Sequence, residues 1–194
     1  MPHTLFISDL HLSEDEPHIT QLFLNFARNT APQAEALYIL GDLFEYWAGD
    51  DDRDTPFHQK IIAAIREVSQ HGTPVYIMHG NRDFLMDQQF AQECKASILP
   101  DPILIDLYGT PTLLTHGDAM CTDDTEYQAF RKQVREPAWR NNFLAQPLAQ
   151  RKAMIEQLRK MSEEQKQTKA TEIMDVNPAA VAEQFRRHGF PRMI

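Results

Sequence analysis

The sequence predicts an α/β fold in which short buried strands alternate with amphipathic helices. Four short apolar runs, each followed by Gly or polar residues, have the pattern of strands that are buried on both faces. Between these runs, apolar residues recur every three to four positions, as on helices that pack against a sheet. With 194 residues, 42% of them apolar and 24% charged, the chain is long enough to bury an ordinary hydrophobic core.

The predicted elements follow one another along the first 120 residues. The strands are expected at Leu5–Ile7, Leu37–Leu40, Val75–Met78, Pro100–Tyr108 and Thr112–Leu114. The last two are expected to pair as a hairpin. Helices are expected around Ile19–Phe26 and Phe57–Val68, and Gly72 is expected to end the second one.

The remaining third of the chain is polar, rich in Gln, Lys and Arg, and helical in its apolar period. We interpret it as a helical insertion, although the helical second half of a single core remains an alternative. The expected organisation is a core over residues 1–120, a helical lid over 121–175, and a return helix with the start of a core strand over 176–194. The charged residues are distributed differently in the two parts. Residues 1–120 contain 6 Lys and Arg and 18 Asp and Glu, whereas residues 121–194 contain 13 Lys and Arg and 10 Asp and Glu.

Composition excludes several classes of protein. The net charge of −9 argues against general nucleic-acid binding. Two cysteines without CxxC spacing favour a reducing compartment over secretion. The first residues lack a basic stretch followed by a long apolar one, and nowhere do 18 apolar residues run together, so neither a signal peptide nor a membrane span is predicted.

Potential metal ligands follow the predicted strands at their carboxyl ends, where open α/β sheets bind ligands. They are Asp9, His11, Asp42, Asn81 and His116. If the first strand continues, Asp9 and His11 project to the same face, because they are two residues apart. Gly41 and Gly80 let the backbone turn or approach a ligand closely just before the next side chain.

The donor set contains carboxylates, imidazoles and an amide but no thiolate. It therefore suits Mn²⁺, Fe or Zn²⁺ in a reactive site better than a structural zinc. A carboxylate shared by two cations would hold them about 3.5–4 Å apart, the spacing of two-metal phosphatases and nucleases.

With Asp-x-His, Gly-Asp, Gly-Asn and a later strand-end His, the chain resembles the binuclear metallophosphoesterases of the calcineurin-like superfamily. That superfamily usually has GNH[DE] at the third motif, whereas Arg82 here replaces the histidine. Five segments carry a closer resemblance, namely ISDLHL, ILGDLFEYWAGDDD, HGNRDFL, HGDAMCTDD and IMDVN. They resemble the subfamily of UDP-2,3-diacylglucosamine diphosphatases, which are peripheral pyrophosphatases of lipid A synthesis. It runs along essentially the whole chain and implies a four-layer αββα sandwich with a helical lid.

The resemblance implies a cofactor of two Mn²⁺ or similar ions, one bound by Asp9 and His11, the other by Asn81 and His116, with Asp42 bridging them. It also implies that activated water attacks the α-phosphorus of UDP-2,3-diacylglucosamine, releasing UMP and leaving 2,3-diacylglucosamine 1-phosphate. The residues expected at the reacting phosphate are Asp42, Asn81, Arg82 and His116. The residues expected to contact substrate are Asn81, Arg82, Asp124, Ser162, Lys166 and Lys169. A surface ion pair for Arg82 and a solvated surface role for the lysines remain alternatives.

The superfamily closes its site with a C-terminal G-H-x-H motif that adds two histidines. The printed sequence ends at Ile194 without that motif. We therefore expect a truncated chain that supplies five of the seven protein ligands and has impaired activity.

A stripe of apolar residues among basic ones is predicted in the lid. The apolar members are Trp139, Phe143, Leu144, Leu148, Met154 and Ile155, and the basic ones are Arg135, Arg140, Arg151 and Lys152. The stripe favours either a membrane interface that admits acyl chains or an internally packed lid. We expect a cytoplasmic protein attached peripherally to the cytoplasmic face of a Gram-negative inner membrane, with a lipid substrate, no nucleic acid and no obligate protein partner.

Other polar residues are expected to be structural or solvated. His79 is predicted to be a core histidine or one that supports a ligand, and His58 is predicted to lie on the surface. The acidic run Asp50–Asp54 lacks EF-hand spacing and is predicted to be a solvated loop. Two other functions stay open, namely another phosphoesterase of the superfamily and a non-catalytic binding protein on this fold.

Overall fold

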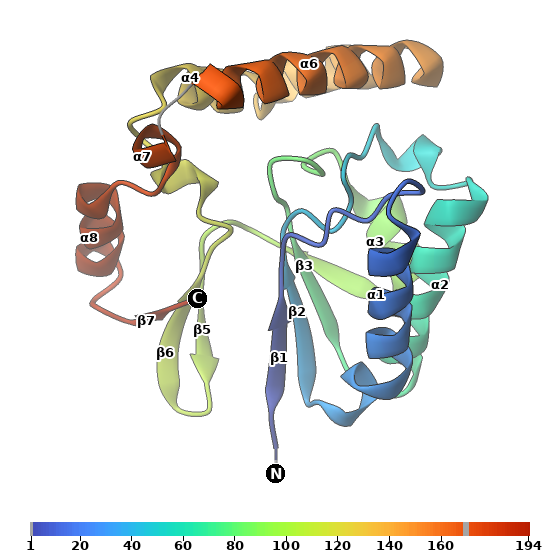
Figure 1. Ribbon diagram of the computed structural model, residues 1–194. Coiled ribbons are helices and arrows are strands. Elements are labelled where there is room, and N and C mark those ends of the chain that lie inside the picture. Colours follow the sequence, from blue (N-terminus) through green and yellow to red (C-terminus); the bar gives the residue numbers. More distant parts are fainter. Residues whose placement is uncertain (1, 169–170) are drawn as a thin grey trace. The chain divides into compact units, whose positions relative to one another are not determined.

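The computed structural model describes residues 2–168 and 171–194, which form two compact units (Figure 1). The first spans Met1–Asp101 and the second Pro102–Ile194.

The first unit is built on a four-stranded parallel sheet in the order β1-β2-β3-β4. Its strands are β1 (Thr4–Ile7), β2 (Ala36–Leu40), β3 (Val75–Met78) and β4 (Ala96–Leu99). Its helices are α1 (Pro17–Asn29), α2 (Pro56–Gln70) and α3 (Gln88–Cys94), with short 3-10 turns η1 (Ala31–Gln33) and η2 (Asp50–Asp52). Successive strands are neighbours, and right-handed crossovers between them place all three helices on one side of the sheet (Figure 1). The α/β class is confirmed, while β4 and α3 were not predicted.

Side-chain alternation gives the sheet two different faces. Leu37 and Ile39 of β2 are buried, as is the apolar side of α2. The alternate positions Phe6, Tyr38 and Tyr76 lie in register on β1, β2 and β3, and their rings stack with centroids 5.1 and 4.7 Å apart. Parallel pairing also brings the carboxyl ends of β1, β2 and β3 to one edge of the sheet, where the predicted ligands of this unit begin.

The second unit contains the predicted hairpin. The strands β5 (Ile103–Leu107) and β6 (Thr110–Leu114) pair antiparallel, and β7 (Arg192–Met193) pairs with β6 in parallel. The hairpin turn is tight because Tyr108 and Gly109 both have positive φ, at 54° and 79°.

The rest of the second unit is helical, as predicted. After the 3-10 turn η3 (Asp118–Met120), its helices are α4 (Thr125–Val134), α5 (Pro137–Leu144), α6 (Leu148–Thr168), α7 (Thr171–Met174) and α8 (Pro178–Arg187). Pro137 and Pro178 stand in the first turn of α5 and α8, where a missing N–H costs nothing. Among the described residues, no helix has the length and apolarity needed to cross a bilayer.

The apolar and basic stripe of the lid divides between interior and surface. Phe143 is buried and stacks on Trp139, with ring centroids 4.8 Å apart. Arg151 is only 1% exposed, and its Nε donates to the carbonyl of Gln146 at 3.0 Å, so it is not part of a basic surface. Met154 remains exposed on α6.

Candidate metal centre

The Asp9 and His11 side chains are oriented by a left-handed backbone and not by strand alternation. Strand β1 ends at Ile7, and Asp9 and His11 have φ values of 53° and 47°. Such values cost a non-glycine residue about 1–2 kcal/mol, so the surroundings must hold them. Hydrogen bonds do so, because the Asp9 and His11 N–H groups donate to the carbonyls of Gly41 and Asp42 at 3.1 and 3.0 Å. The expectation of a continuing strand was therefore wrong.

Asp42 occupies the centre of this loop region. Its φ is 51°, its side chain is almost fully buried, and its Oδ1 accepts from the Arg82 backbone N–H at 2.8 Å. Gly80 approaches it so closely that a Cβ there would overlap the Asp42 Oδ1 and backbone nitrogen. The predicted use of Gly80 for a close backbone approach is therefore confirmed, and the approach brings the Asn81 loop beside Asp42.

Two of the predicted ligands, Asp9 and His11, each approach Asp42 within the first unit. A carboxylate oxygen of Asp9 lies within 4.8 Å of one of Asp42, and the His11 Nε2 lies 3.8 Å from the Asp42 Oδ2. Ligands at roughly 2.1 Å from a shared cation are roughly 3–4 Å apart, so the His11–Asp42 separation fits one ion. Two carboxylates and an imidazole are donors that suit Mn²⁺, Fe or Zn²⁺. The residues present therefore fit a divalent cation.

Glu45, which sequence reasoning missed, adds a further carboxylate beside this set. Its Oε2 lies 3.0 Å from the His11 Nδ1, and its Oε1 lies 3.5 Å from an Arg82 guanidinium nitrogen. The pKa of His11 is raised, chiefly by the nearby Glu45 carboxylate and further by the Asp42 charge, against an opposing effect of burial. Arg82 thus forms an ion pair, as the alternative expected, but with Glu45 and with a side chain that is largely buried.

Asp83 connects the loops that follow β2 and β3. Its buried carboxylate accepts from the backbone N–H groups of Leu43 at 2.8 Å and Gly80 at 2.9 Å. Burial and the neighbouring Asp42 charge raise the pKa of Asp83 to about 6. Asp83 was not predicted as part of the site, although it directly follows Asn81 and Arg82 in the sequence.

The second unit carries His116, two residues beyond the end of β6. Gly117 follows in the left-handed region at φ 96° and leads into η3. There the buried Asp118 accepts hydrogen bonds from the Tyr127 hydroxyl and the Arg131 Nε, both at 2.7 Å. Burial opposes ionisation of Asp118, but the contacts with Arg131, Tyr127 and Arg135 outweigh it and lower its pKa. The segment that bears His116 is thereby fastened to α4.

Asp124 has a structural role within this unit. It is buried, and its Oδ1 accepts from the Tyr127 backbone N–H at 3.0 Å as the N-cap of α4. The preceding Asp123 accepts two hydrogen bonds from the Asn177 amide, at 2.9 and 3.0 Å. Asn177 also caps α8 through the N–H groups of Ala179 and Ala180. The motif residues around Asp124 and Asn177 thus join the start of α4 to the start of α8.

The remaining predicted substrate residues lie on or beyond α6. Ser162 is half-buried on this helix. Lys166 falls within α6, but its side chain lies outside the described residues, and so does the whole of Lys169. Their substrate roles remain predictions.

His79 and His58 of the first unit each have a ring nitrogen close to a backbone carbonyl oxygen. His79 is half-buried, and its Nε2 lies 2.8 Å from the carbonyl oxygen of Met86. The surface prediction for His58 was wrong, because its ring is buried, with Nδ1 2.7 Å from the carbonyl oxygen of Asp52. Its spacing from Ile61, Ile62 and Ile65 places it on the buried side of α2 and was the signal that could have found it.

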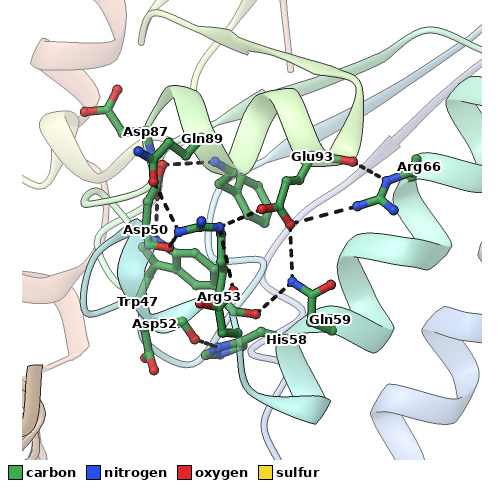
Figure 2. Close-up of polar contacts among 12 residues, drawn as sticks. Trp47, Asp50, Asp52, Arg53, His58, Gln59, Arg66, Asp87, Gln89 and Glu93 are labelled. Atoms are coloured by element: carbon green, nitrogen blue, oxygen red, sulfur yellow. Dashed lines mark hydrogen bonds and ion pairs between the residues drawn. The ribbon is translucent and has the colours of Figure 1, made fainter.

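The acidic run is solvated only in part, because Asp51 and Asp54 are exposed as predicted whereas Asp50 and Asp52 are held by the fold. We call the group formed by Trp47, Asp50, Arg53, Gln59 and Glu93 the Asp50 cluster, and Figure 2 shows Arg53 lying between Asp50 and Glu93. The Asp50 carboxylate accepts from the Trp47 indole and from the backbone N–H groups of Asp87 and Phe90, at 3.1, 2.9 and 2.9 Å. The prediction failed for Asp50 and Asp52, because the N–H groups of Asp87 and Phe90 reach Asp50 from a distant segment and Asp52 is only 1% exposed.

Known proteins resemble the chain along nearly its whole length. A family model described as calcineurin-like phosphoesterase matches residues 2–175. The chain is 52% identical over 190 residues to the UDP-2,3-diacylglucosamine hydrolase of Aromatoleum aromaticum, covering 98% of this chain and 77% of that protein. Proteins of the same description from Marinobacter nauticus and Edwardsiella ictaluri are 51% and 48% identical over 191 residues, covering 98% of this chain and 78% and 73% of theirs. The chain therefore belongs to the calcineurin-like phosphoesterase family.

Proposed function

We propose that this protein hydrolyses the pyrophosphate bond of UDP-2,3-diacylglucosamine to UMP and 2,3-diacylglucosamine 1-phosphate, a step of lipid A biosynthesis. The observation that carries the proposal is the approach of Asp9 and of His11 to Asp42, beyond the ends of β1 and β2, in a chain of this family. The described relatives at 48–52% identity support the choice of substrate.

Five residues would hold two divalent cations, with Mn²⁺ the ion we propose. They are Asp9, His11, Asp42, Asn81 and His116. The charge and donor types of Asp9, His11 and Asp42 support this assignment. When bound, the cations would supply an activated water at neutral pH and neutralise charge on the phosphate oxygens.

The chain's own residues would bind and orient the pyrophosphate. Arg82 has its backbone N–H fixed on Asp42 and its guanidinium on Glu45, an arrangement that supports presentation of further N–H donors to a phosphate. Asn81 precedes it in the same loop. Asp83 would keep this loop against the β2 end through its two backbone hydrogen bonds.

The helical part of the second unit would bind the rest of the substrate. We assign this role to residues 121–175 as a lid and, within it, to Asp124, Ser162, Lys166 and Lys169. Exposed apolar side chains on α6, Met154 and Met161, support contact with acyl chains or with the cytoplasmic face of the inner membrane. In a vesicle sedimentation assay, Met154→Glu together with Met161→Glu should reduce binding to anionic vesicles relative to the wild type. Equal sedimentation of both proteins would contradict membrane contact through α6.

The test of the proposed function is release of UMP from UDP-2,3-diacylglucosamine in the presence of Mn²⁺. We expect turnover that is lost on chelation and restored by Mn²⁺, with p-nitrophenyl phosphate hydrolysed far more slowly. Turnover of p-nitrophenyl phosphate alone would instead indicate another phosphoesterase. Binding of the lipid without any hydrolysis would indicate a binding protein on this fold.

A further inference from the structure

The lid over residues 121–175 begins and ends beside the same strand of the second unit. It follows β6 through the turn η3, after which the chain enters α4. It returns through α8, and the strand β7 that comes after α8 pairs with β6 in parallel. The arrangement of the lid therefore depends on how its two ends are joined.

Asn177 contacts both ends of the lid. Its amide nitrogen lies 2.9 and 3.0 Å from the two carboxylate oxygens of Asp123, and its backbone N–H donates to the Met120 carbonyl at 2.8 Å. Its Oδ1 accepts from the N–H groups of Ala179 and Ala180 at 2.8 and 3.2 Å. The first two contacts cross from the returning end of the lid to the outgoing end, whereas the third stays within α8.

Only an amide side chain makes all of these contacts. The Asn177 oxygen serves as the acceptor that caps α8, and its nitrogen serves as the donor that reaches Asp123. An aspartate at this position could still cap α8, but it has no donor and would place a second negative charge against Asp123. The cap and the contact across the lid can therefore be separated by substitution.

The contact across the lid lies next to residues that are proposed to bind substrate. Asp123 directly precedes Asp124, which caps α4. The returning arm of the lid carries Ser162 on α6. Joining the two arms at their base restricts the motion of Asp124 relative to Ser162, and a restricted site loses less conformational freedom when it binds a ligand.

We propose that Asn177 is a positioning residue that joins the two ends of the lid and thereby holds its arms in the arrangement that binds substrate. This inference rests on the proposed function, because it takes residues 121–175 as a lid that binds substrate. It extends that proposal by giving a role to the last residue of the IMDVN segment, which acts through Asp123 and touches no substrate itself.

The first experiment measures the contact in the full chain without metal or substrate. In Asn177→Asp, the backbone amide at position 177 should exchange its hydrogen about 3- to 10-fold faster than in the wild type, by NMR and after correction for intrinsic rates. The Val181 amide, which donates to the carbonyl of residue 177 within α8, should keep its rate because aspartate also caps helices. Equal acceleration at both amides, or none at position 177, would overturn the proposal.

The second experiment exchanges the two side chains. Asp123→Asn together with Asn177→Asp lets the amide donate from the α4 side to a carboxylate that still caps α8. This double variant should regain most of the slow exchange at position 177, because the two residues act as a pair. Exchange as fast as in Asn177→Asp alone would overturn the contact. The matched control is Asn29→Asp, the same change of charge at an exposed position of α1, which should leave this exchange unchanged.

The third experiment measures the consequence for the substrate in the Mn²⁺-loaded enzyme. Asn177→Asp should raise the KM for UDP-2,3-diacylglucosamine about 3- to 10-fold and change kcat by less than about twofold, because the contact orders the lid and not the reacting groups. The double variant should lower KM again. A role in folding alone would reduce the amount of active enzyme, which lowers the apparent kcat but leaves KM unchanged.

The outcomes separate this inference from the proposed function. If the wild type hydrolyses the substrate and Asn177→Asp has the same KM, the inference is overturned and the proposed function stands. If the wild type does not hydrolyse UDP-2,3-diacylglucosamine, the proposed function fails together with the role of Asn177 in substrate binding. The exchange measurements still decide whether Asn177 joins the two ends of the lid.

Discussion

Two carboxylate-rich regions of the first unit use the same residue types in opposite ways. In the candidate metal centre, an Asp9 oxygen and an Asp42 oxygen lie within 4.8 Å of each other, and the nearest His11 nitrogen is 3.8 Å from Asp42. In the Asp50 cluster, each carboxylate is surrounded by protein donors instead (Figure 2). Arg53 Nε donates to Glu93 at 2.6 Å, and Gln59 donates to the other Glu93 oxygen at 3.2 Å.

A structural carboxylate is surrounded by donors from the protein, whereas a carboxylate positioned for a cation lies beside other potential ligands. Asp50 accepts from backbone N–H groups at the start of α3 and Glu93 pairs with Arg53, and these contacts fasten α3 to the loop before α2. Asp9 and Asp42 bring like charges together on a backbone held in the left-handed region, which costs free energy in the protein alone. A cation bound between the two carboxylates would offset this repulsion.

The largest effect is expected from Asp42→Ala, because Asp42 is the proposed bridge between two cations. Turnover should fall at least about 10³-fold, comparable to removal of a central catalytic group, and bound metal should be lost. Metal content by mass spectrometry and UMP release check this, with the exposed Asp54→Ala as the control. Near-normal turnover of Asp42→Ala at saturating Mn²⁺ would mean that Asp42 contributes no more to activity than Asp54. It would contradict the distinction between the candidate metal centre and the Asp50 cluster.

The next effect is expected from Arg82→Ala. Because its guanidinium is proposed to bind the phosphate, kcat/KM should fall about 10²-fold while the metal content stays at the wild-type level. Kinetics and metal analysis of the same preparation separate the two roles. Loss of metal together with activity would show that Arg82 supports the ligands and does not act on the substrate.

Asp50→Ala should change stability and leave function intact. It removes the acceptor for the N–H groups of Asp87 and Phe90 at the start of α3 and for the Trp47 indole. We expect the free energy of unfolding to fall by about 1–2 kcal/mol, measured by urea denaturation. Mn²⁺ affinity should not change, and a weakened Mn²⁺ affinity would mean that the two regions are not separate in function.

The smallest effect concerns the pH dependence of the Asp50 cluster. The hydrogen bond from Arg53 lowers the pKa of Glu93 below its ordinary value of 4.5. A lowered folded-state pKa stabilises the protein above the unfolded-state value, and this contribution is lost as the pH falls through the folded-state pKa. The difference in unfolding free energy between wild type and Glu93→Gln should be under about 1 kcal/mol near neutral pH, because Glu93 is partly exposed.

That difference should shrink as urea denaturation is repeated at successively lower pH below 4.5. A difference that grows on acidification would mean that Glu93 is not held in its ionised form by Arg53.

Local pattern was sufficient for the strands and for the candidate ligands that follow them. Continuous apolar runs predicted β1, β2, β3 and the β5–β6 hairpin. By contrast, β4 reads Ala-Ser-Ile-Leu and lacks the continuous run of large apolar residues that marks β2 and β3, and α3 is too short for a helical period to stand out. The Asp-x-His spacing predicted two ligands on one face of a continuing strand, but β1 ends at Ile7 and both residues lie beyond it in the left-handed region.

Apolar periodicity and motifs contiguous in the chain were enough to predict the α/β class, the order of most elements and the family, but not β4 or α3. Only the tertiary structure decided the roles of Glu45, Asp83, Asp50 and His58. Each role depends on a partner brought close by folding, such as Arg82 for Glu45 and the Phe90 N–H for Asp50. The sequence alone does not distinguish these carboxylates from one another. Whether a carboxylate caps a helix, lies beside an imidazole or faces another carboxylate depends on the groups that surround it after folding.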